Sequence, residues 1–356
     1  MVARRTAPRR SRTLRRALAI FILLIVLLVV GGLIAGWMLF LKPDHDIAPG
    51  RAVQVEIVPG MSTGQIAERL SRAGVVENAN MFRLQVRLDG TGGQLKSGVY
   101  ELSTAMEYED VAEVLIAGPV YTYYTVTVPE GFVVEQIAAR FEEKAGIPAS
   151  EFLALAKGGA SQFAGEHPYL SDAYQGSLEG FLFPKTYRVR EGSTATEVIS
   201  MMLDQFDREI ADVDFSYPES RGMSVHSTIV LASMIEREVS VASERELVSS
   251  VIYNRLDKDM RLEIDATIEY VLPGNRFRLR ASDIEIDSPY NTYRNKGLPP
   301  GAIANPGKAA IQAACSPAKT EYLYYVLTAR DGSHTFATNH AEFLIAKRKS
   351  KEVFGQ

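Results

Sequence analysis

Cysteine, tryptophan and histidine are scarce in this sequence of 356 residues. Cys315 is its one cysteine, so the chain cannot form an intrachain disulfide, a fact compatible with either redox compartment. The five histidines are scattered along the chain. His334 and His340 are six residues apart in a predicted hairpin region, which is a poor spacing for a metal site. We therefore expect no metal.

Acidic residues are absent from the first sixteen positions, and charge of either sign is absent from the next 25. Residues 1–16 carry seven arginines, and residues 17–41 are uncharged. As a helix the uncharged run would be about 37 Å long, enough to cross a hydrocarbon core of about 30 Å. A cleaved signal peptide has a shorter apolar region with small residues at the cut site. We therefore predict a transmembrane helix at 17–41, with the arginine-rich tail 1–16 in the cytoplasm.

The rest of the chain has an excess of negative charge. Removing the seven arginine charges from the net charge of −4 leaves −11 for residues 17–356. An acidic exterior is unsuited to binding a polyanion, so nucleic acid is not expected as a partner. Residues 42–50 contain two prolines and a glycine and are predicted to be a short linker.

An internal repeat follows the linker. A strand-like run ends at Pro59-Gly60 and precedes Gln65-Ile66-Ala67, and a second run ends at Pro129-Glu130-Gly131 and precedes Gln136-Ile137-Ala138. A further strand and helix are expected between the copies. Short strands mixed with short helices indicate a small α+β module over residues 51–160, and the repeated phrase indicates that this module is duplicated. Chance recurrence is the alternative, and the shared Gln-Ile-Ala favours duplication.

The candidate catalytic residue lies in the centre of the remaining region, 161–356. Apolar residues recur at helical spacing from Thr228 to Val239, and Glu236 lies on the side of this helix that carries Ala232 and Ser233. Apolar neighbours disfavour the charged form of a carboxyl group, as a general acid at neutral pH requires. Glu238, two positions on, faces elsewhere. On pattern alone, a half-exposed structural glutamate remains the commoner interpretation.

Turn-forming segments and a hairpin follow the central helices. Ser243 is expected to begin a second helix, and Asn305 with Pro306 to begin a later one. Residues 321–336 alternate around Asp331-Gly332, which predicts a β-hairpin.

Many short motifs, in one order, resemble the endolytic murein transglycosylase family, also called YceG-like. They are Glu179-Gly-Phe-Leu-Phe-Pro-x-Thr-Tyr187, Ala232-Ser-Met-Ile-Glu-Arg-Glu238, Ala242-Ser-Glu-Arg245, Asn254-Arg-Leu256, Met260-Arg-Leu262, Asp265-x-Thr267, Tyr290-Asn-Thr-Tyr293, Gly297-Leu-Pro-Pro-Gly301 and Ala318-Lys-Thr-x-Tyr-Leu-Tyr324. The likeness extends from the apolar run to the last helix.

The resemblance implies a fold and a location. The fold would be α+β, with a single transmembrane helix, a LysM-like module at 51–160 and a lysozyme-like catalytic domain at 161–356. The protein would be a single-pass protein of the bacterial inner membrane with its catalytic domain in the periplasm. Its partners would be peptidoglycan strands and the membrane, with peptidoglycan synthases left open.

The resemblance also implies a reaction without a metal or cofactor. The family's catalytic glutamate corresponds to Glu236. Its carboxylic acid would protonate the leaving glycosidic oxygen, and the carboxylate would then accept the proton of the muramyl C6 hydroxyl, closing a 1,6-anhydro ring.

Six further residues are candidates for substrate binding. Tyr290, Asn291, Thr292 and Tyr293 offer rings for sugar stacking and polar groups for N-acetyl recognition, or they form a structured turn. Asp265 is either a second carboxylate in the cleft or a helix cap before Thr267. Arg245 and Arg255 are expected in surface or ion-pair roles rather than as ligands of the peptide stem.

Two other functions remain compatible with the sequence. A lysozyme-type muramidase would add water and leave a reducing end, and a non-catalytic anchor would bind wall polymer only.

Overall fold

The computed structural model describes residues 11–38, 48–272 and 279–355, which fall into two compact units, Met1–Tyr121 and Thr122–Gln356. Most of the predicted tail, the end of the predicted span and most of the linker at 42–50 lie outside the described residues.

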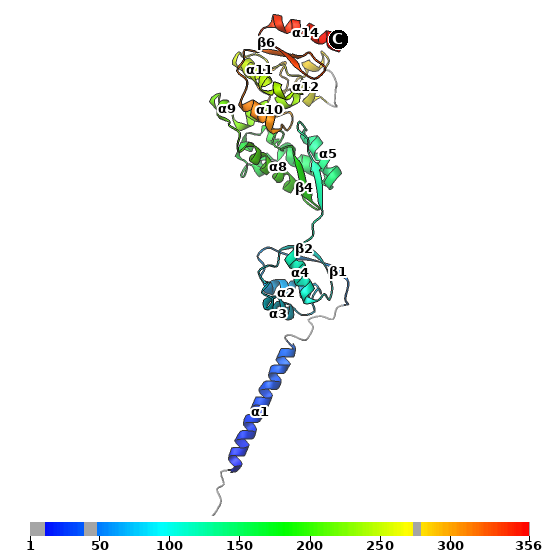
Figure 1. Ribbon diagram of the computed structural model, residues 1–356, viewed down its shortest axis with the longest axis vertical. Helices are drawn as coiled ribbons and strands as arrows, with labels where there is room; N and C mark the ends of the chain where they lie inside the picture. The colour runs from blue at the N-terminus through cyan, green and yellow to red at the C-terminus, as the bar shows by residue number, and fades with distance from the viewer. Residues whose placement is uncertain (1–10, 39–47, 273–278, 356) are drawn as a thin grey trace, which may run out of the picture. The chain divides into compact units, whose positions relative to one another are not determined.

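The N-terminal helix α1 spans Ser11–Gly36 (Figure 1). Within it, Arg16–Gly36 is long and apolar enough to cross a membrane, with a mean hydropathy of 3.3 in its most apolar window. Its large apolar side chains are exposed, among them Phe21, Leu28 and Leu33. An unburied apolar helix of this length is consistent with a single-pass membrane anchor.

The small module that follows has the element order strand, helix, helix, strand, helix. Its elements are β1 (Ala52–Ile57), α2 (Thr63–Arg72), α3 (Ala79–Leu88), β2 (Gly98–Ser103) and α4 (Tyr108–Ala117). β1 and β2 pair antiparallel. Ser62 and Gln65 form a capping box at the start of α2, which orients the helix so that Ile66 and Leu70 are buried in the module's own core.

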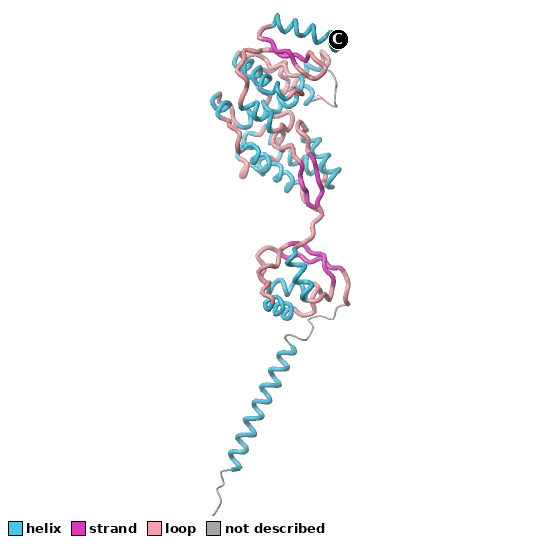
Figure 2. Tube along the Cα trace, viewed as in Figure 1, coloured by secondary structure: helices cyan, strands magenta, loops and turns pink. Residues whose placement is uncertain are grey.

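The second unit begins with the same order of elements. β3 (Tyr123–Thr127), α5 (Val134–Ala145) and α6 (Ala149–Gly158) are followed by a short helix α7 (Ala160–Phe163), two 3-10 turns (Pro168–Asp172 and Tyr174–Gly176), β4 (Thr186–Arg190) and α8 (Ala195–Ile210). β3 and β4 also pair antiparallel. The described residues form three such two-stranded pairs, whose strands are magenta in Figure 2.

Two tyrosines occupy matching positions in the two strand pairs, outside the segments whose sequences resemble each other. Tyr100 on β2 pairs with Val55, and Tyr187 on β4 pairs with Val126. Each tyrosine hydroxyl donates to a backbone carbonyl four residues earlier, at 2.7 Å to Lys96 and 2.5 Å to Phe183. The two segments therefore match in both strands of each pair, as duplication predicts.

The remaining elements of the second unit include one helix that is buried over most of its length. They are α9 (Ser216–Ser220), α10 (Val225–Glu238), α11 (Arg245–Asp257), α12 (Asp265–Val271), α13 (Lys308–Cys315), the hairpin β5 (Tyr324–Leu327) with β6 (His334–Ala337), and α14 (His340–Phe354), with 3-10 turns at Ala242–Glu244 and Asp283–Glu285. Every residue of α10 from Thr228 to Ile235 is buried. The predicted hairpin is confirmed, and α14 packs against it (Figure 1).

Three local expectations differ from the structure. The compact second unit starts at Thr122, not at 161, because β3, α5 and α6 contribute to its core. Helix α11 starts at Arg245 without a side-chain cap, so Ser243 does not begin it. Helix α13 starts at Lys308 and is likewise uncapped by Asn305, whose side chain is used elsewhere.

The position of the unit boundary can be tested with two fragments. We expect residues 122–356 to unfold cooperatively in urea. Residues 161–356 lack β4's partner strand and the buried side chains of Val126, Phe141 and Phe152. Deleting one buried aromatic side chain costs about 3–5 kcal/mol, against a typical total stability of about 5–15 kcal/mol.

Circular dichroism during urea titration is the measurement. A cooperative transition of 161–356 at the midpoint of 122–356 would contradict the assignment of β3, α5 and α6 to the second unit.

Candidate active site

Glu236 lies in the last turn of α10, where this buried helix reaches the surface. It is half-buried, whereas the preceding eight residues are buried and Arg237 is exposed. One carboxylate oxygen, Oε2, accepts a hydrogen bond from the backbone N–H of Gly307 at 3.1 Å. Ser233, one turn earlier on the same side, accepts a hydrogen bond from the N–H of Ile303 at 3.0 Å. The helix and the loop 301–307 are therefore joined at two points.

The environment of Glu236 favours its protonated form. Burial is the largest influence and raises the pKa of Glu236, because a desolvated carboxylate is less stable than the neutral acid. The Gly307 hydrogen bond opposes this, the charge of Glu130 raises the pKa further, and the charge of Arg245 lowers it. Glu236 therefore combines a raised pKa with partial access to solvent, as a general acid requires.

Gly307 brings a second carboxylate to the site. A Cβ built on Gly307 would lie 1.9 Å from Oε1 of Glu130, so the Glu130 side chain occupies the space that any larger residue would need. The loop around Glu130 is fixed by two backbone hydrogen bonds, from Gly131 to the Asn305 carbonyl and from Asn305 to the Phe132 carbonyl, each 2.9 Å. Glu130 and Glu236 thus both contact Gly307.

The side chain of Asn305 holds three segments together behind this site. Its Oδ1 accepts hydrogen bonds from the N–H groups of Gly180 and Leu182, at 3.0 and 2.9 Å. Its Nδ2 donates to the Phe132 carbonyl at 2.9 Å and to Glu179 at 2.7 Å. The bonds to Gly180, Leu182 and Glu179 are buried, so water cannot replace them if the amide is lost.

The segment that carries Gly180 needs a glycine. At Gly180 the backbone φ is +94°, and a Cβ would lie 2.6 Å from Ala302 and 2.9 Å from Ile229. The close approach lets the motif of residues 179–187 contact both α10 and the loop 301–307.

Glu179 is a third carboxyl group near Glu236, and unlike Glu236 it is fully buried. Its carboxylate accepts hydrogen bonds from the Val134 N–H at 3.2 Å and the Tyr270 hydroxyl at 3.4 Å. Burial raises the pKa of Glu179 to about 8. Because it is only 3% exposed, it supports the loops and does not face a substrate.

Glu238 faces away from Glu236, as predicted. Its oxygens accept hydrogen bonds from the Ala266 N–H at 3.4 Å and the Tyr325 hydroxyl at 3.2 Å. Burial, followed by the charge of Asp265, raises the pKa of Glu238 to about 7. Glu238 therefore joins α10 to α12 and β5.

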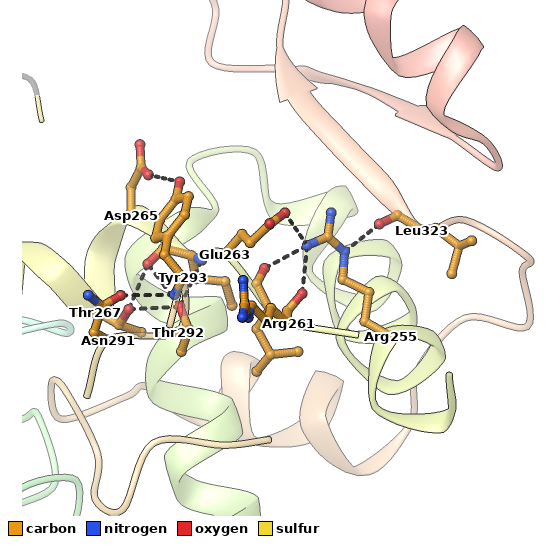
Figure 3. Close-up of polar contacts among 11 residues, drawn as sticks. Arg255, Arg261, Glu263, Asp265, Thr267, Asn291, Thr292, Tyr293 and Leu323 are labelled. Carbon is orange, nitrogen blue, oxygen red and sulfur yellow. Dashed lines mark hydrogen bonds and ion pairs between the residues drawn. The ribbon is translucent and has the colours of Figure 1, made fainter. Parts of the chain in front are cut away.

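Three of the six predicted substrate-binding residues are buried and have structural partners. Thr267, Asn291 and Thr292 are at most 2% exposed. The Thr267 and Thr292 hydroxyls lie 2.9 Å apart (Figure 3). Asn291 Nδ2 donates to the carbonyls of Ile284 and Ile286. These three side chains hold the loop 284–293 against α12. This arrangement corresponds to the structured turn, one of the two alternatives that the sequence left open for these residues.

Asp265, Tyr290 and Tyr293 remain accessible. Asp265 is exposed, accepts a hydrogen bond from the Tyr293 hydroxyl (Figure 3) and does not cap α12. Tyr290 is half-buried, and its ring lies 5.1 Å from that of Tyr270 and 6.2 Å from that of Tyr174. These three residues remain candidates for contact with a ligand.

The two arginines considered earlier have different surroundings. Arg255 is 8% exposed. It donates to the backbone carbonyls of Leu323, Arg261 and Leu262 (Figure 3). Arg245 is half-buried, and its Nε is buried without a hydrogen-bond partner. Arg255 therefore has a structural role, whereas the Nε donor of Arg245 makes no hydrogen bond.

The sequence contains one feature that distinguishes Glu130 as a candidate functional residue. The first copy of the repeat turns at Pro59-Gly60, whereas the second inserts Glu130 between proline and glycine. A charged insertion in a repeated turn distinguishes the copies. Gly307 and Asn305 carry no such signal, because their partners are distant in sequence. Among the described residues, no group of histidines, cysteines and carboxylates is placed to hold a metal ion.

Comparison with known proteins identifies the class. A sequence model of the YceG-like family matches residues 55–349. The chain is 32% identical over 331 residues to a Bacillus subtilis protein named endolytic murein transglycosylase, covering 90% of this chain and 91% of that protein. A Streptococcus pneumoniae protein of the same name is 31% identical over 323 residues, which are 83% of this chain and 58% of the pneumococcal protein.

A solved structure agrees with this class. The 2.6 Å crystal structure of a yceG-like protein from Listeria monocytogenes is 32% identical and superposes with a TM-score of 0.57, covering 83% of this chain and 99% of that one. This chain belongs to the YceG-like family.

The importance of Asn305 can be tested by substitution. Asn305→Ala leaves the buried N–H groups of Gly180 and Leu182 without partners, and we expect a loss of at least about 3 kcal/mol in the free energy of unfolding. Asn295→Ala, at an exposed amide, should cost less than about 1 kcal/mol because water replaces its bonds. Urea unfolding of both variants is the measurement, and equal losses would contradict the bridging role.

Proposed function

We propose that this chain is an endolytic lytic transglycosylase that cleaves the bond between N-acetylmuramic acid and N-acetylglucosamine within nascent peptidoglycan strands. The main observation that supports this proposal is the environment of Glu236. Its carboxyl group has a raised pKa, lies at the surface end of a buried helix and accepts a hydrogen bond from the N–H of Gly307. Membership of a family whose relatives are named endolytic murein transglycosylase supports the substrate and the reaction.

In the proposed mechanism Glu236 acts first as an acid and then as a base. The protonated carboxyl donates its proton to the glycosidic oxygen as the bond from that oxygen to the muramyl C1 breaks. The resulting carboxylate accepts the proton of the C6 hydroxyl on the same muramyl residue, and that oxygen bonds to C1. The ring closes to a 1,6-anhydro sugar, Glu236 regains its proton, and water is not consumed.

Glu130 supplies a negative charge beside the reacting centre in this proposal. Its charge raises the pKa of Glu236 and so increases the fraction of Glu236 that can donate a proton. A carboxylate at this position would also stabilise positive charge that develops on C1 as the bond breaks. Asp265, Tyr290 and Tyr293 are proposed to contact the sugars.

The same carboxylate favours one alternative function. A hydrolytic muramidase uses two carboxyl groups, of which the second either activates a water molecule or attacks C1. Glu130 and Glu236, both in contact with Gly307, would meet that need. The two reactions differ in product, because a muramidase leaves a reducing end and a transglycosylase leaves an anhydro end.

The N-terminal parts are proposed to position the enzyme. We infer that α1 crosses the inner membrane with the arginine-rich tail in the cytoplasm and residues 51–356 in the periplasm. The module 52–117 has the order strand, helix, helix, strand of a LysM-like domain, and a groove of about 800 Å³ beside β1 and α2 is available for wall polymer. A short tether would keep the site near membrane-attached strands.

The role of Glu236 is tested by Glu236→Gln. This substitution keeps the shape and removes proton donation and acceptance, so cleavage of purified glycan strands should fall by at least about 10²-fold. Glu238→Gln is the matched control, two residues along the same helix and facing Ala266 and Tyr325, and should retain activity. Fragment release is followed by liquid chromatography with mass detection. Comparable activity of wild type and Glu236→Gln would remove the assignment.

The role of Glu130 is tested by the pH dependence of Glu130→Gln. Cleavage needs protonated Glu236, so the rate falls as pH rises through the pKa of Glu236. Glu130 raises that pKa, and its removal should shift the alkaline limb of kcat/KM to lower pH. Glu151→Gln, at an exposed position on α6, should leave the limb in place. An unchanged or upward-shifted limb in Glu130→Gln would contradict the proposed electrostatic role.

A further inference from the structure

A polar groove runs beside α13 in the second unit. It has a volume of about 660 Å³ and is bordered by the segment 212–214, the residues at the start of α11 and one side of α13. Its polar lining includes Asp214, Ser243, Arg245, Glu246, Gln312 and Ser316. Apart from Arg245, whose charge lowers the pKa of Glu236, these residues have no role in the catalytic mechanism described above.

The groove begins close to the catalytic carboxylate. The residue before α13, Gly307, donates its N–H to Glu236, and Ala309, Gln312 and Ala313 on that helix line the groove. Arg245 lines the groove too, and its charge acts on the Glu236 carboxyl, whose pKa it lowers. A substrate group attached near the cleaved bond would therefore reach the groove directly.

Arg245 has hydrogen-bonding capacity that the folded chain leaves unused. Its Nε is buried without a partner, and a buried unsatisfied donor costs about 1–3 kcal/mol. A guanidinium binds a carboxylate through two parallel N–H donors. Because Arg245 is half-buried and its Nε is covered, the accessible part of its guanidinium would supply them. Arg255 differs, because its Nε and Nη1 donate to backbone carbonyls. The guanidinium of Arg245 therefore has donors that an anionic ligand could use.

The other charges in the groove limit what this ligand can be. Asp212 forms an ion pair with Lys308 at 2.7 Å, and Asp214 accepts a hydrogen bond from the Ser216 N–H at 2.9 Å. These two acids therefore have partners. The other acid of the lining is Glu246, which follows Arg245 in the chain and is exposed. A cation beside an anion suits a zwitterionic ligand, and the Gln312 amide and Ser243 hydroxyl suit the peptide groups of a backbone.

We propose that this groove binds the peptide stem of the muramyl residue, with a stem carboxylate on Arg245. The stem is joined through a lactyl ether to O3 of the sugar whose C1–O bond is broken, so it leaves the ring within a few bonds of the reacting carbon. This inference rests on the proposed function and adds to it a preference for strands that still carry peptides.

The first experiment measures substrate preference with the full-length protein in detergent. Glycan strands bearing stem peptides are compared with the same strands after an amidase has removed the stems. The readout is the ratio of the two kcat/KM values, because Arg245 also acts on Glu236 and its replacement changes both. We expect a ratio above about 10 for wild type, as one charge-assisted pair can supply.

Three variants separate binding from general damage. Arg245→Gln should reduce the ratio about tenfold, mainly through KM, and Arg245→Lys should restore part of it, because lysine keeps the charge without the paired donors. Arg237→Gln, an exposed arginine on α10, should keep the wild-type ratio. A wild-type ratio near one, or an equal ratio in wild type and Arg245→Gln, would overturn the proposal.

The second experiment does not depend on cleavage. Binding of a soluble muramyl tripeptide to the Glu236→Gln protein is measured by calorimetry, with and without Arg245→Gln, and with the peptide carboxylates free or amidated. Saturable binding that weakens about tenfold on either change supports the groove. Absence of saturable binding, or equal binding in all cases, overturns it.

The two experiments keep the two proposals apart. Cleavage of both strand types at one rate would refute the stem site and leave the transglycosylase proposal standing. Carboxylate-dependent binding without any cleavage would do the reverse.

Discussion

The proposed active site depends on the backbone hydrogen bond between Gly307 and Glu236. That bond exists because the loop 301–307 is held in one conformation, and Asn305 is the residue that holds it. Its amide joins the loop to the segment 180–182 and to Phe132, while its backbone pairs with the turn that contains Glu130. A single side chain therefore fixes the relative positions of both carboxylates that contact Gly307.

The strength of Glu236 as an acid is set by opposing influences of known sign. Burial and the charge of Glu130 raise its pKa, while the Gly307 hydrogen bond and the charge of Arg245 lower it. A deeper position would keep the proton on Glu236 but exclude the substrate, as at Glu179, whose pKa burial raises to about 8. At the end of α10, Glu236 is partly buried and partly accessible to solvent, which is the combination that our proposal requires.

The parts of the protein that follow a periodic pattern were predictable from sequence. The helix around Glu236, the apolar N-terminal helix and the hairpin at Asp331-Gly332 each depend on residues close together in the chain. Asn305 was misread as a helix cap, because its partners Gly180 and Leu182 are 125 and 123 residues away. No local pattern records such a contact.

The sequence left open whether the residues at 290–293 bind sugar or form a structured turn, and a related reason explains why it could not decide. Thr267, Asn291 and Thr292 are polar residues in a turn-rich segment, where polarity predicts exposure. In the structure they satisfy one another and the backbone in the interior. Polar side chains that bind a ligand and polar side chains that bind a loop have the same composition. Only the burial of each separates Thr267 from the exposed Asp265.

The central claim is that the muramyl C6 hydroxyl, and not water, replaces the leaving sugar. The direct measurement is mass spectrometry of the new muramyl ends after wild-type protein cuts purified glycan strands in water enriched in heavy oxygen. We expect 1,6-anhydro ends that are lighter than hydrolytic ends by one water and carry no label. Labelled reducing ends would contradict it and assign the pair Glu130 and Glu236 to a muramidase.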